Sequence, residues 1–233
     1  MIKRILAVAK NQNYINEDMM KKRTFLFDFD GTLVNSMPTF SSLMMRILDE
    51  YGISYGEDIV KIITPLGYHG TAKYFIKLGI DETAEALVTK MNEYALPDYT
   101  NTIPEKDGVI DTLKALKSHG CDLNILTASP HSALDVCLRR LGIYELFSNV
   151  WSCEDFGTTK SNPEIYVSAA KKIGAPINEV IFVDDNVNAV KTARDAGMIA
   201  YGIFDESSAD YVEEMKSVSH RYVYNFRELW EEN

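Results

Sequence analysis

Apolar residues along the chain recur with two different periods, and the change of period divides the sequence into parts. After Pro104 short apolar runs, typical of buried strands, alternate with stretches whose apolar residues have helical spacing. The predicted strands cover residues 24–29, 123–126, 147–151, 180–183, 199–204 and 222–224. The predicted helices include residues 109–118, 133–141, 164–173 and 189–196. This alternation predicts an α/β fold, a doubly wound, Rossmann-like parallel sheet with helices on both faces.

The segment between the first two predicted strands has helical periodicity only. Its predicted helices cover residues 38–51, 72–78 and 81–96. The third helix is expected to end before Pro97, because proline lacks the backbone N–H that a helix interior uses. We therefore expect an all-helical cap domain inserted into the α/β core. The expected boundaries are 37–100 for the cap, and 23–36 with 101–233 for the core.

Within the cap, the Gly-flanked sequence LGYHGT is expected to be a loop that can reach the cleft and contact a leaving group. His69 lies in this sequence and is a candidate for substrate binding, although a lone histidine in a loop is more often a surface residue. Phe40 and Met44 fall on the apolar stripe of the first cap helix, so we expect them in the core, with a position on the substrate side as the alternative.

The charge and the cysteine content narrow the classes of partner. The 233 residues carry a formal net charge of −10, which argues against nucleic acid or an anionic membrane surface as a partner. No apolar run has the length of a membrane-spanning helix. The three cysteines match no zinc or disulfide pattern, so we expect reduced thiols and a cytoplasmic location. Residues 1–22 are expected to be an extension ahead of the fold, and translation could begin at Met19 or Met20.

Polar side chains of particular types follow four of the predicted strands. Asp28 and Asp30 end the first, Thr127 ends the second, Lys160 follows the third, and Asp184 and Asp185 end the fourth. Ligands of open parallel sheets bind beyond the carboxyl ends of the strands, so we expect these side chains to share one cleft. Ser129, two residues after Thr127, is expected to cap the next helix.

Four carboxylates cannot share a cleft in ionised form without compensating positive charge. Mg²⁺ prefers oxygen ligands and would supply that charge, and the ammonium group of Lys160 would add to it. Asp28 and Asp30 are alternate residues of an extended segment, so both can face the cleft. One of them can act as a nucleophile and the other as a general acid and base.

These motifs resemble the haloacid dehalogenase-like (HAD) superfamily, and specifically its helical-cap subfamily with phosphoglycolate phosphatase and β-phosphoglucomutase. The motifs are DFDGT at Asp28, Thr127 in ILTAS, Lys160 in TTKSNPEIY, and Asp184 with Asp185 in IFVDDN. The match covers nearly the whole chain after residue 23. Ser161 stands where the superfamily often has proline, which puts the shape of that loop in doubt.

The resemblance implies a role for each motif residue. Asp28 would form an aspartyl-phosphate, and Asp30 would be the general acid and base. Mg²⁺ would be bound by Asp28, the main-chain carbonyl of Asp30, and Asp185, with Asp184 binding directly or through water. The phosphoryl group would be held by Thr127, Ala128 and Lys160.

We therefore expect a Mg²⁺-dependent phosphatase acting on a small phosphorylated metabolite, as a monomer or homodimer. Two alternatives stay open: a phosphomutase of the β-phosphoglucomutase type, and a non-catalytic protein that senses a phosphorylated ligand. The presence of both Asp28 and Asp30 argues against a sensor, which needs neither a nucleophile nor an acid. Sugar phosphates, phosphoglycolate and nucleoside monophosphates are all candidate substrates.

Overall fold

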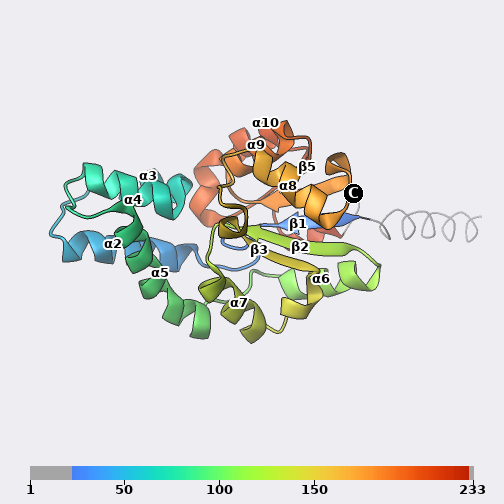
Figure 1. Ribbon diagram of the computed structural model, residues 1–233, viewed down its shortest axis with the longest axis horizontal. Coiled ribbons are helices and arrows are strands. Elements are labelled where there is room, and N and C mark those ends of the chain that lie inside the picture. The colour runs from blue at the N-terminus through green and yellow to red at the C-terminus, as the bar shows by residue number, and fades with distance from the viewer. Residues whose placement is uncertain (1–22, 231–233) are drawn as a thin grey trace, which may run out of the picture.

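Six parallel strands form the centre of the molecule, in the order β3-β2-β1-β4-β5-β6 (Figure 1). The computed structural model describes residues 23–230. The strands are β1 (Thr24–Phe27), β2 (Asp122–Thr127), β3 (Asn149–Ser152), β4 (Val180–Asp184), β5 (Ile199–Ile203) and β6 (Arg221–Val223). The chain order reverses direction between β1 and β4, which places the switch point of the sheet there.

Helices cover both faces of the sheet, as the alternating pattern predicts. One face packs against α6 (Val109–Ser118) and α7 (His131–Arg140), and the other against α8 (Glu164–Ile173), α9 (Val187–Asp195) and α10 (Val212–Val218). Alternate residues of β1 divide between the two cores: Phe25 and Phe27 pack on the side of α6 and α7, and Leu26 packs on the other. The predicted doubly wound α/β fold is confirmed.

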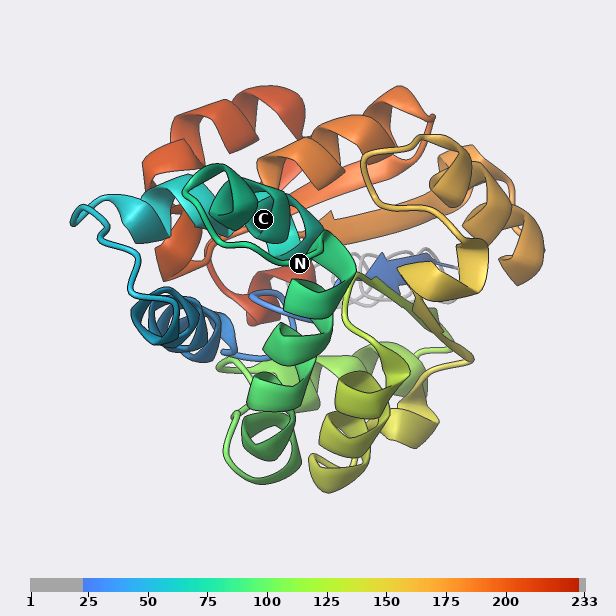
Figure 2. The same cartoon turned by 60° about the vertical axis from the view of Figure 1, so that its left-hand side comes forward.

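The expected helical insertion lies between β1 and β2, beyond the carboxyl end of β1 (Figures 1 and 2). It contains α2 (Met37–Glu50), α3 (Ile59–Ile63), the 3-10 turn η1 (Thr64–Leu66), α4 (Gly67–Lys77) and α5 (Ala84–Asn101). Met44 is fully buried among these helices, while Phe40 is buried and also borders the cavity described below. The domain boundary at residues 100 and 101 remains a prediction; it falls at the end of α5.

Two local predictions in the cap are wrong. The LGYHGT sequence is not a loop, because all but its first residue lie in α4, which begins at Gly67 with a φ of 61°. The buried hydroxyl of Thr71 donates to the Ile63 carbonyl 3.3 Å away, which ties α4 to α3. A side chain in this sequence can therefore enter the cleft only from a helical backbone.

The last cap helix continues through Pro97 to Asn101 instead of ending before the proline. Proline removes one backbone hydrogen bond, but the helix end is held by other contacts. The side-chain amide of Asn101 donates to the Pro97 carbonyl at 2.7 Å, and the helix packs along α7, as Figure 2 shows. These contacts outweigh the missing bond.

The expected extension at residues 1–22 lies outside the described residues, so the alternative starts at Met19 and Met20 stay predictions. Among the helices of residues 23–230, none combines the length and apolarity that crossing a bilayer requires.

Candidate active site

The carboxyl ends of β1 and β4 bring three buried aspartates together. The backbone N–H of Asp28 donates to the Val183 carbonyl at 2.9 Å, which fixes Asp28 beside the end of β4. Asp28, Asp184 and Asp185 each offer a carboxylate oxygen, and these oxygens all lie within 4.8 Å of one another. All three side chains are buried, and Asp184 is fully inaccessible. The sequence predicts that these three residues lie together where their strands end, and the structure places them there.

Lys160 places its ammonium group between two of these carboxylates. Its Nζ lies 2.7 Å from Asp28 Oδ1 and 2.8 Å from Asp184 Oδ2. Burial lowers the pKa of Lys160, but the negative charges of Asp184 and Asp28 outweigh it, so the pKa lies well above its usual value. The lysine is therefore charged throughout the physiological pH range. The loop reaches the two carboxylates with Ser161 in place of the proline that the superfamily often has.

One lysine does not balance three carboxylates. Burial and the charge of Asp28 raise the pKa of Asp184 to about 7, although Lys160 opposes them. Burial, Asp184 and Asp28 raise the pKa of Asp185 well above its usual range. A group of closely spaced oxygen donors with excess negative charge fits a hard divalent cation. The aspartate cluster could therefore hold a metal ion.

The turn after Asp30 shapes the cluster from the other side. Gly31 has a φ of 74°, and a Cβ there would lie 2.5 Å from an Asp185 carboxylate oxygen, so a larger residue would strain the backbone and displace that carboxylate. Thr32 Oγ1 donates to Asp185 Oδ1 at 2.9 Å and accepts the backbone N–H of Asp185 at 3.2 Å. This orienting role of Thr32 was not predicted, although its place directly after Gly31 in the motif signals a fixed position.

Asp30 contacts hydroxyl groups and does not belong to the cluster of Asp28, Asp184 and Asp185. The hydroxyl of Tyr99, from the last cap helix, donates to Asp30 Oδ1, and the hydroxyl of Ser129 donates to Oδ2. The expectation that Ser129 caps α7 is wrong, because the residue before α7 is Pro130 and no side chain caps that helix. Burial and the charge of Asp28 raise the pKa of Asp30 despite these hydroxyls, which favours its neutral form.

A cavity of about 470 Å³ opens above this group, between the core and the cap. On its core side it is lined by Asp28, Asp30, Thr127, Ala128, Lys160 and Asp185. Thr127 is nearly inaccessible, and its Oγ1 accepts the backbone N–H of Ser129 at 3.1 Å. Every predicted site residue of the core therefore borders one cavity, except Asp184, which lies beneath it and contacts Lys160.

The cap side of the cavity is mainly apolar and aromatic, with positive charge. Tyr68 stacks on Phe40 with ring centroids 5.6 Å apart, and both line the cavity. His69 also borders it, so the cap residue expected near the cleft is there, although its side chain is largely exposed. Lys73, one helical turn later in α4, borders it too and was not predicted. None of the described residues that line this cap wall carries a carboxylate, which would repel a phosphorylated substrate.

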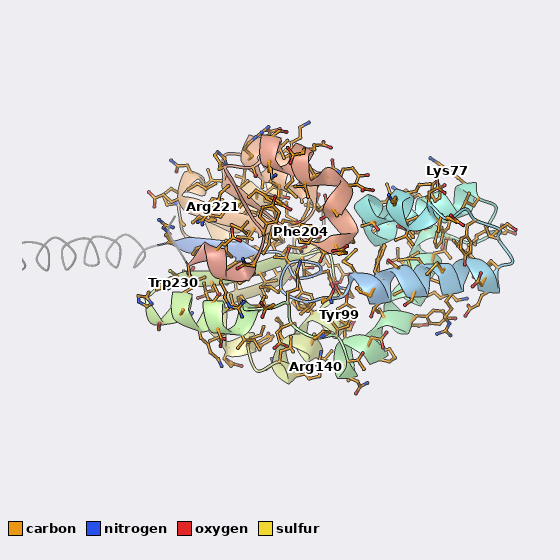
Figure 3. All side chains as sticks on the ribbon, turned by 180° about the vertical axis from the view of Figure 1, so that it is seen from behind. Lys77, Tyr99, Arg140, Phe204, Arg221 and Trp230 are labelled. Carbon is orange, nitrogen blue, oxygen red and sulfur yellow. The ribbon has the colours of Figure 1, made fainter. Side chains whose placement is uncertain are left out.

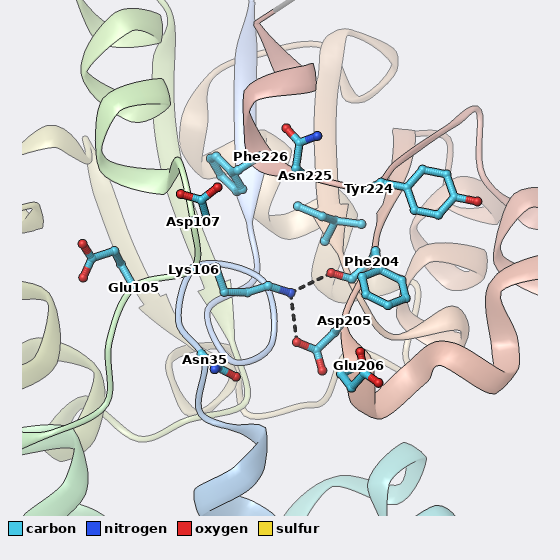
Figure 4. A pocket seen from close by; sticks show the side chains of 11 residues that line it. Asn35, Glu105, Lys106, Asp107, Phe204, Asp205, Glu206, Tyr224, Asn225 and Phe226 are labelled. Carbon is cyan, nitrogen blue, oxygen red and sulfur yellow. Dashed lines mark hydrogen bonds and ion pairs between the residues drawn. The ribbon is translucent and has the colours of Figure 1, made fainter.

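A second cavity, of about 300 Å³, lies beside the first turn and the end of β5 (Figure 4). Lys106 Nζ donates to the carbonyls of Gly31 and Phe204 at 2.5 and 2.7 Å, and lies 2.9 Å from Asp205 Oδ2. Asp205 is almost completely buried. Lys106 thereby connects the turn that carries Asp30 to the end of β5. Its ammonium group has three N–H donors, and these three contacts use them all, so none is left for a ligand.

Replacing this lysine gives a test of the connection. We expect Lys106→Met to lower the free energy of unfolding by about 3 kcal/mol, because it leaves Asp205 buried without its cation. Urea denaturation of the wild type and the variant measures the change. Lys114→Met, which replaces an exposed lysine on α6, is the matched control and should change stability little. Equal stability of both variants would contradict a structural role for Lys106.

Known proteins resemble this chain in sequence. The family model described as haloacid dehalogenase-like hydrolase matches residues 22–197. Pyrophosphatase PpaX of Oceanobacillus iheyensis is 28% identical over 181 residues, covering 77% of this chain and 82% of that protein.

Solved structures share the fold. A predicted phosphoglycolate phosphatase from Haemophilus somnus has a TM-score of 0.74 at 21% identity, covering 90% of this chain and 96% of that one. A family IA, variant 3 HAD hydrolase from Entamoeba histolytica has a TM-score of 0.77 at 23% identity, with coverage of 88% and 94%. At these identities the structural likeness establishes the fold, and the family model establishes the relationship. The chain belongs to the haloacid dehalogenase-like hydrolases.

Proposed function

We propose that the protein is a Mg²⁺-dependent phosphatase that hydrolyses a small phosphate monoester through an aspartyl-phosphate on Asp28. The observation that carries this proposal is the position of Asp28, with Lys160 2.7 Å from one oxygen and the carboxylates of Asp184 and Asp185 close by, at the floor of a cavity. Membership of a hydrolase family supports the same reaction class. A protein that only binds phosphate would not need this group of neighbouring carboxylates.

In the first step a carboxylate oxygen of Asp28 attacks phosphorus. The new bond joins Asp28 to phosphorus, the bond from phosphorus to the leaving oxygen breaks, and Asp30 gives its proton to that oxygen. The raised pKa of Asp30 supports this assignment, because the neutral form is the one that can donate. Asp28 is the better nucleophile of the two, since it lies against the ammonium group that can attract the phosphoryl oxygens.

In the second step Asp30, now ionised, takes a proton from water while the water oxygen attacks phosphorus. The bond from phosphorus to Asp28 breaks, the Asp28 carboxylate is restored, and inorganic phosphate leaves. Lys160 offsets the negative charge of the phosphoryl oxygens, and Thr127 and Ala128 border the space where those oxygens would lie. Charge stabilisation of this kind is the main source of catalysis in phosphoryl transfer.

The aspartate cluster fits Mg²⁺ in its donor chemistry. Asp28 and Asp185 would bind it, with the main-chain carbonyl of Asp30, and Asp184 would bind directly or through water. When bound, Mg²⁺ supplies positive charge next to the phosphoryl oxygens and offsets the repulsion among the carboxylates. Thr32 would keep Asp185 turned toward the ion.

The lining of the cap wall fits two classes of leaving group. Similarity to Pyrophosphatase PpaX favours inorganic pyrophosphate as a second candidate substrate, and the ammonium group of Lys73 and the ring N–H of His69 at the cap wall would suit its second phosphate. The size of the cavity and the rings of Phe40 and Tyr68 instead favour an organic leaving group. Because of this cavity, we propose a phosphate monoester and not pyrophosphate as the preferred substrate.

A substrate panel with Mg²⁺ tests the proposal. It contains p-nitrophenyl phosphate, sugar phosphates, phosphoglycolate, nucleoside monophosphates and inorganic pyrophosphate, and free phosphate is measured for each. We expect at least one monoester to have a higher kcat/KM than pyrophosphate. A preference for pyrophosphate would contradict the monoester assignment, and conversion of a hexose phosphate to its isomer without phosphate release would indicate a mutase. Absence of any turnover would favour a phospho-ligand sensor.

A further inference from the structure

We infer that Tyr99, a residue of the cap, is a positioning residue for Asp30: its hydroxyl holds the carboxyl group where it can protonate the leaving oxygen in the first step and deprotonate the attacking water in the second. This inference rests on the proposed phosphatase function and adds a residue that none of the sequence motifs contains. It also gives the last cap helix a part in the chemistry, in addition to shaping the cavity.

The contact between the two side chains is enclosed. Tyr99 is 4% exposed, and its hydroxyl donates to Asp30 Oδ1, while Ser129 donates to Oδ2. Each carboxylate oxygen therefore has one hydroxyl partner, one from the cap and one from the core. An ionised carboxylate has about four acceptor sites, so each oxygen keeps a site free to face the cavity. Asp30 is thus fixed without being closed off from a substrate.

The phenol ring is held by the core although Tyr99 belongs to α5. Its ring stacks on Phe29, with centroids 6.0 Å apart. Arg140 of α7 donates from Nε to the Tyr99 carbonyl at 3.2 Å and from Nη2 to the Ile103 carbonyl. Figure 3 shows Tyr99 at the junction of cap and core, with Arg140 close by. The end of α5 is therefore anchored to α7, and the hydroxyl has a fixed position relative to Asp30.

Hydroxyl partners suit a group that must change its protonation state. A hydroxyl can donate to a carboxylate or accept from a carboxylic acid, whereas an ammonium or amide N–H can only donate. Asp30 therefore keeps its place when it gives its proton to the leaving oxygen and when it later takes one from water. Loss of the Tyr99 hydroxyl should let the carboxyl group rotate, and misplacement of a reacting group is costly in rate.

Leaving groups of different basicity distinguish positioning of the acid from general damage to the site. A phenoxide leaving group needs the proton of Asp30, whereas the weakly basic p-nitrophenoxide needs it far less. For Tyr99→Phe we expect kcat/KM for phenyl phosphate to fall about 30-fold, and kcat/KM for p-nitrophenyl phosphate to fall less than about threefold. The substitution keeps the ring against Phe29, and its melting temperature checks the fold.

Tyr94→Phe is the matched control, because Tyr94 lies on the same helix and its hydroxyl bonds to Glu50 away from the cavity. It should leave both rate constants unchanged. Tyr99→Met, which also lacks the hydroxyl, replaces Tyr99→Phe if that variant does not fold. An equal fall for both esters, or no fall for either, would overturn the role of Tyr99. Absence of turnover in the wild type would overturn the proposed function, and this inference with it.

Discussion

Asp28→Asn is expected to lower kcat by about 10⁴-fold or more, with substrate binding largely retained. The amide oxygen is a poor nucleophile, and the aspartyl-phosphate cannot form on it. The fold should persist, because the change removes one of three mutually repelling carboxylates and leaves Lys160 paired with Asp184. Steady-state kinetics on the best ester of the panel measures the loss.

The matched control for this variant is Asp111→Asn, since Asp111 is exposed in the first turn of α6. It makes the same chemical change far from the cavity and should leave kcat within about twofold. Preserved turnover in Asp28→Asn, with the identity of residue 28 checked by mass spectrometry, would contradict the nucleophile assignment. The melting temperatures of both variants show whether a loss of turnover in Asp28→Asn comes from the missing nucleophile or from unfolding.

We expect the second large effect from removal of divalent cations. Excess EDTA is expected to reduce turnover to the background level, and added Mg²⁺ to restore it, because without the ion the carboxylates of Asp28 and Asp185 repel the phosphoryl group. Saturating Mg²⁺, at a hundredfold excess over its Kd, should also stabilise the fold by about 2.7 kcal/mol. Turnover at the full rate in EDTA would contradict the metal requirement.

The stabilisation by Mg²⁺ should depend on pH in a defined direction. The pKa of Asp184 is raised to about 7 in the folded protein without metal, and that of Asp185 is also raised, so the folded state binds more protons than the unfolded state. Stability without metal therefore falls as the pH rises from about 4, where unfolded aspartates titrate, to about 7. Mg²⁺ competes with those protons.

Thermal unfolding in EDTA and in Mg²⁺ measures this dependence. The increase in Tm caused by Mg²⁺ should be larger at about pH 8 than at about pH 5, because protons no longer occupy the carboxylates at the higher pH. A pH-independent increase would mean that the ion binds elsewhere than at Asp184 and Asp185.

The positions of the strand-end residues could be predicted because they depend on a local signal. A short apolar run followed directly by Asp28, or by Asp184 and Asp185, marks the carboxyl end of a buried parallel strand. In a parallel sheet the carboxyl ends of all strands lie along one edge. The topology therefore brings these residues together, however the helices between the strands pack. Lys160 follows the same rule, because the loop after β3 returns to that edge.

The contacts of Asp30 could not be predicted in the same way. Tyr99 is 69 residues from Asp30 along the chain, and the periodicity of α5 shows only that Tyr99 lies on a buried face. The meeting of the two side chains depends on how far α5 continues past Pro97, and tertiary packing decides that against local propensity. Ser129 was assigned to the helix cap for a similar reason, since capping is the local role of serine.

The most direct test of the account is to trap the phosphorylated residue. The enzyme is quenched during turnover and treated with borohydride, which reduces an acyl phosphate to an alcohol, and its peptides are sequenced by mass spectrometry. We predict homoserine in place of Asp28 in the wild type, and no such product in Asp28→Asn. Homoserine at a different aspartate, or an unmodified Asp28 in every peptide while phosphate is being released, would contradict the central claim.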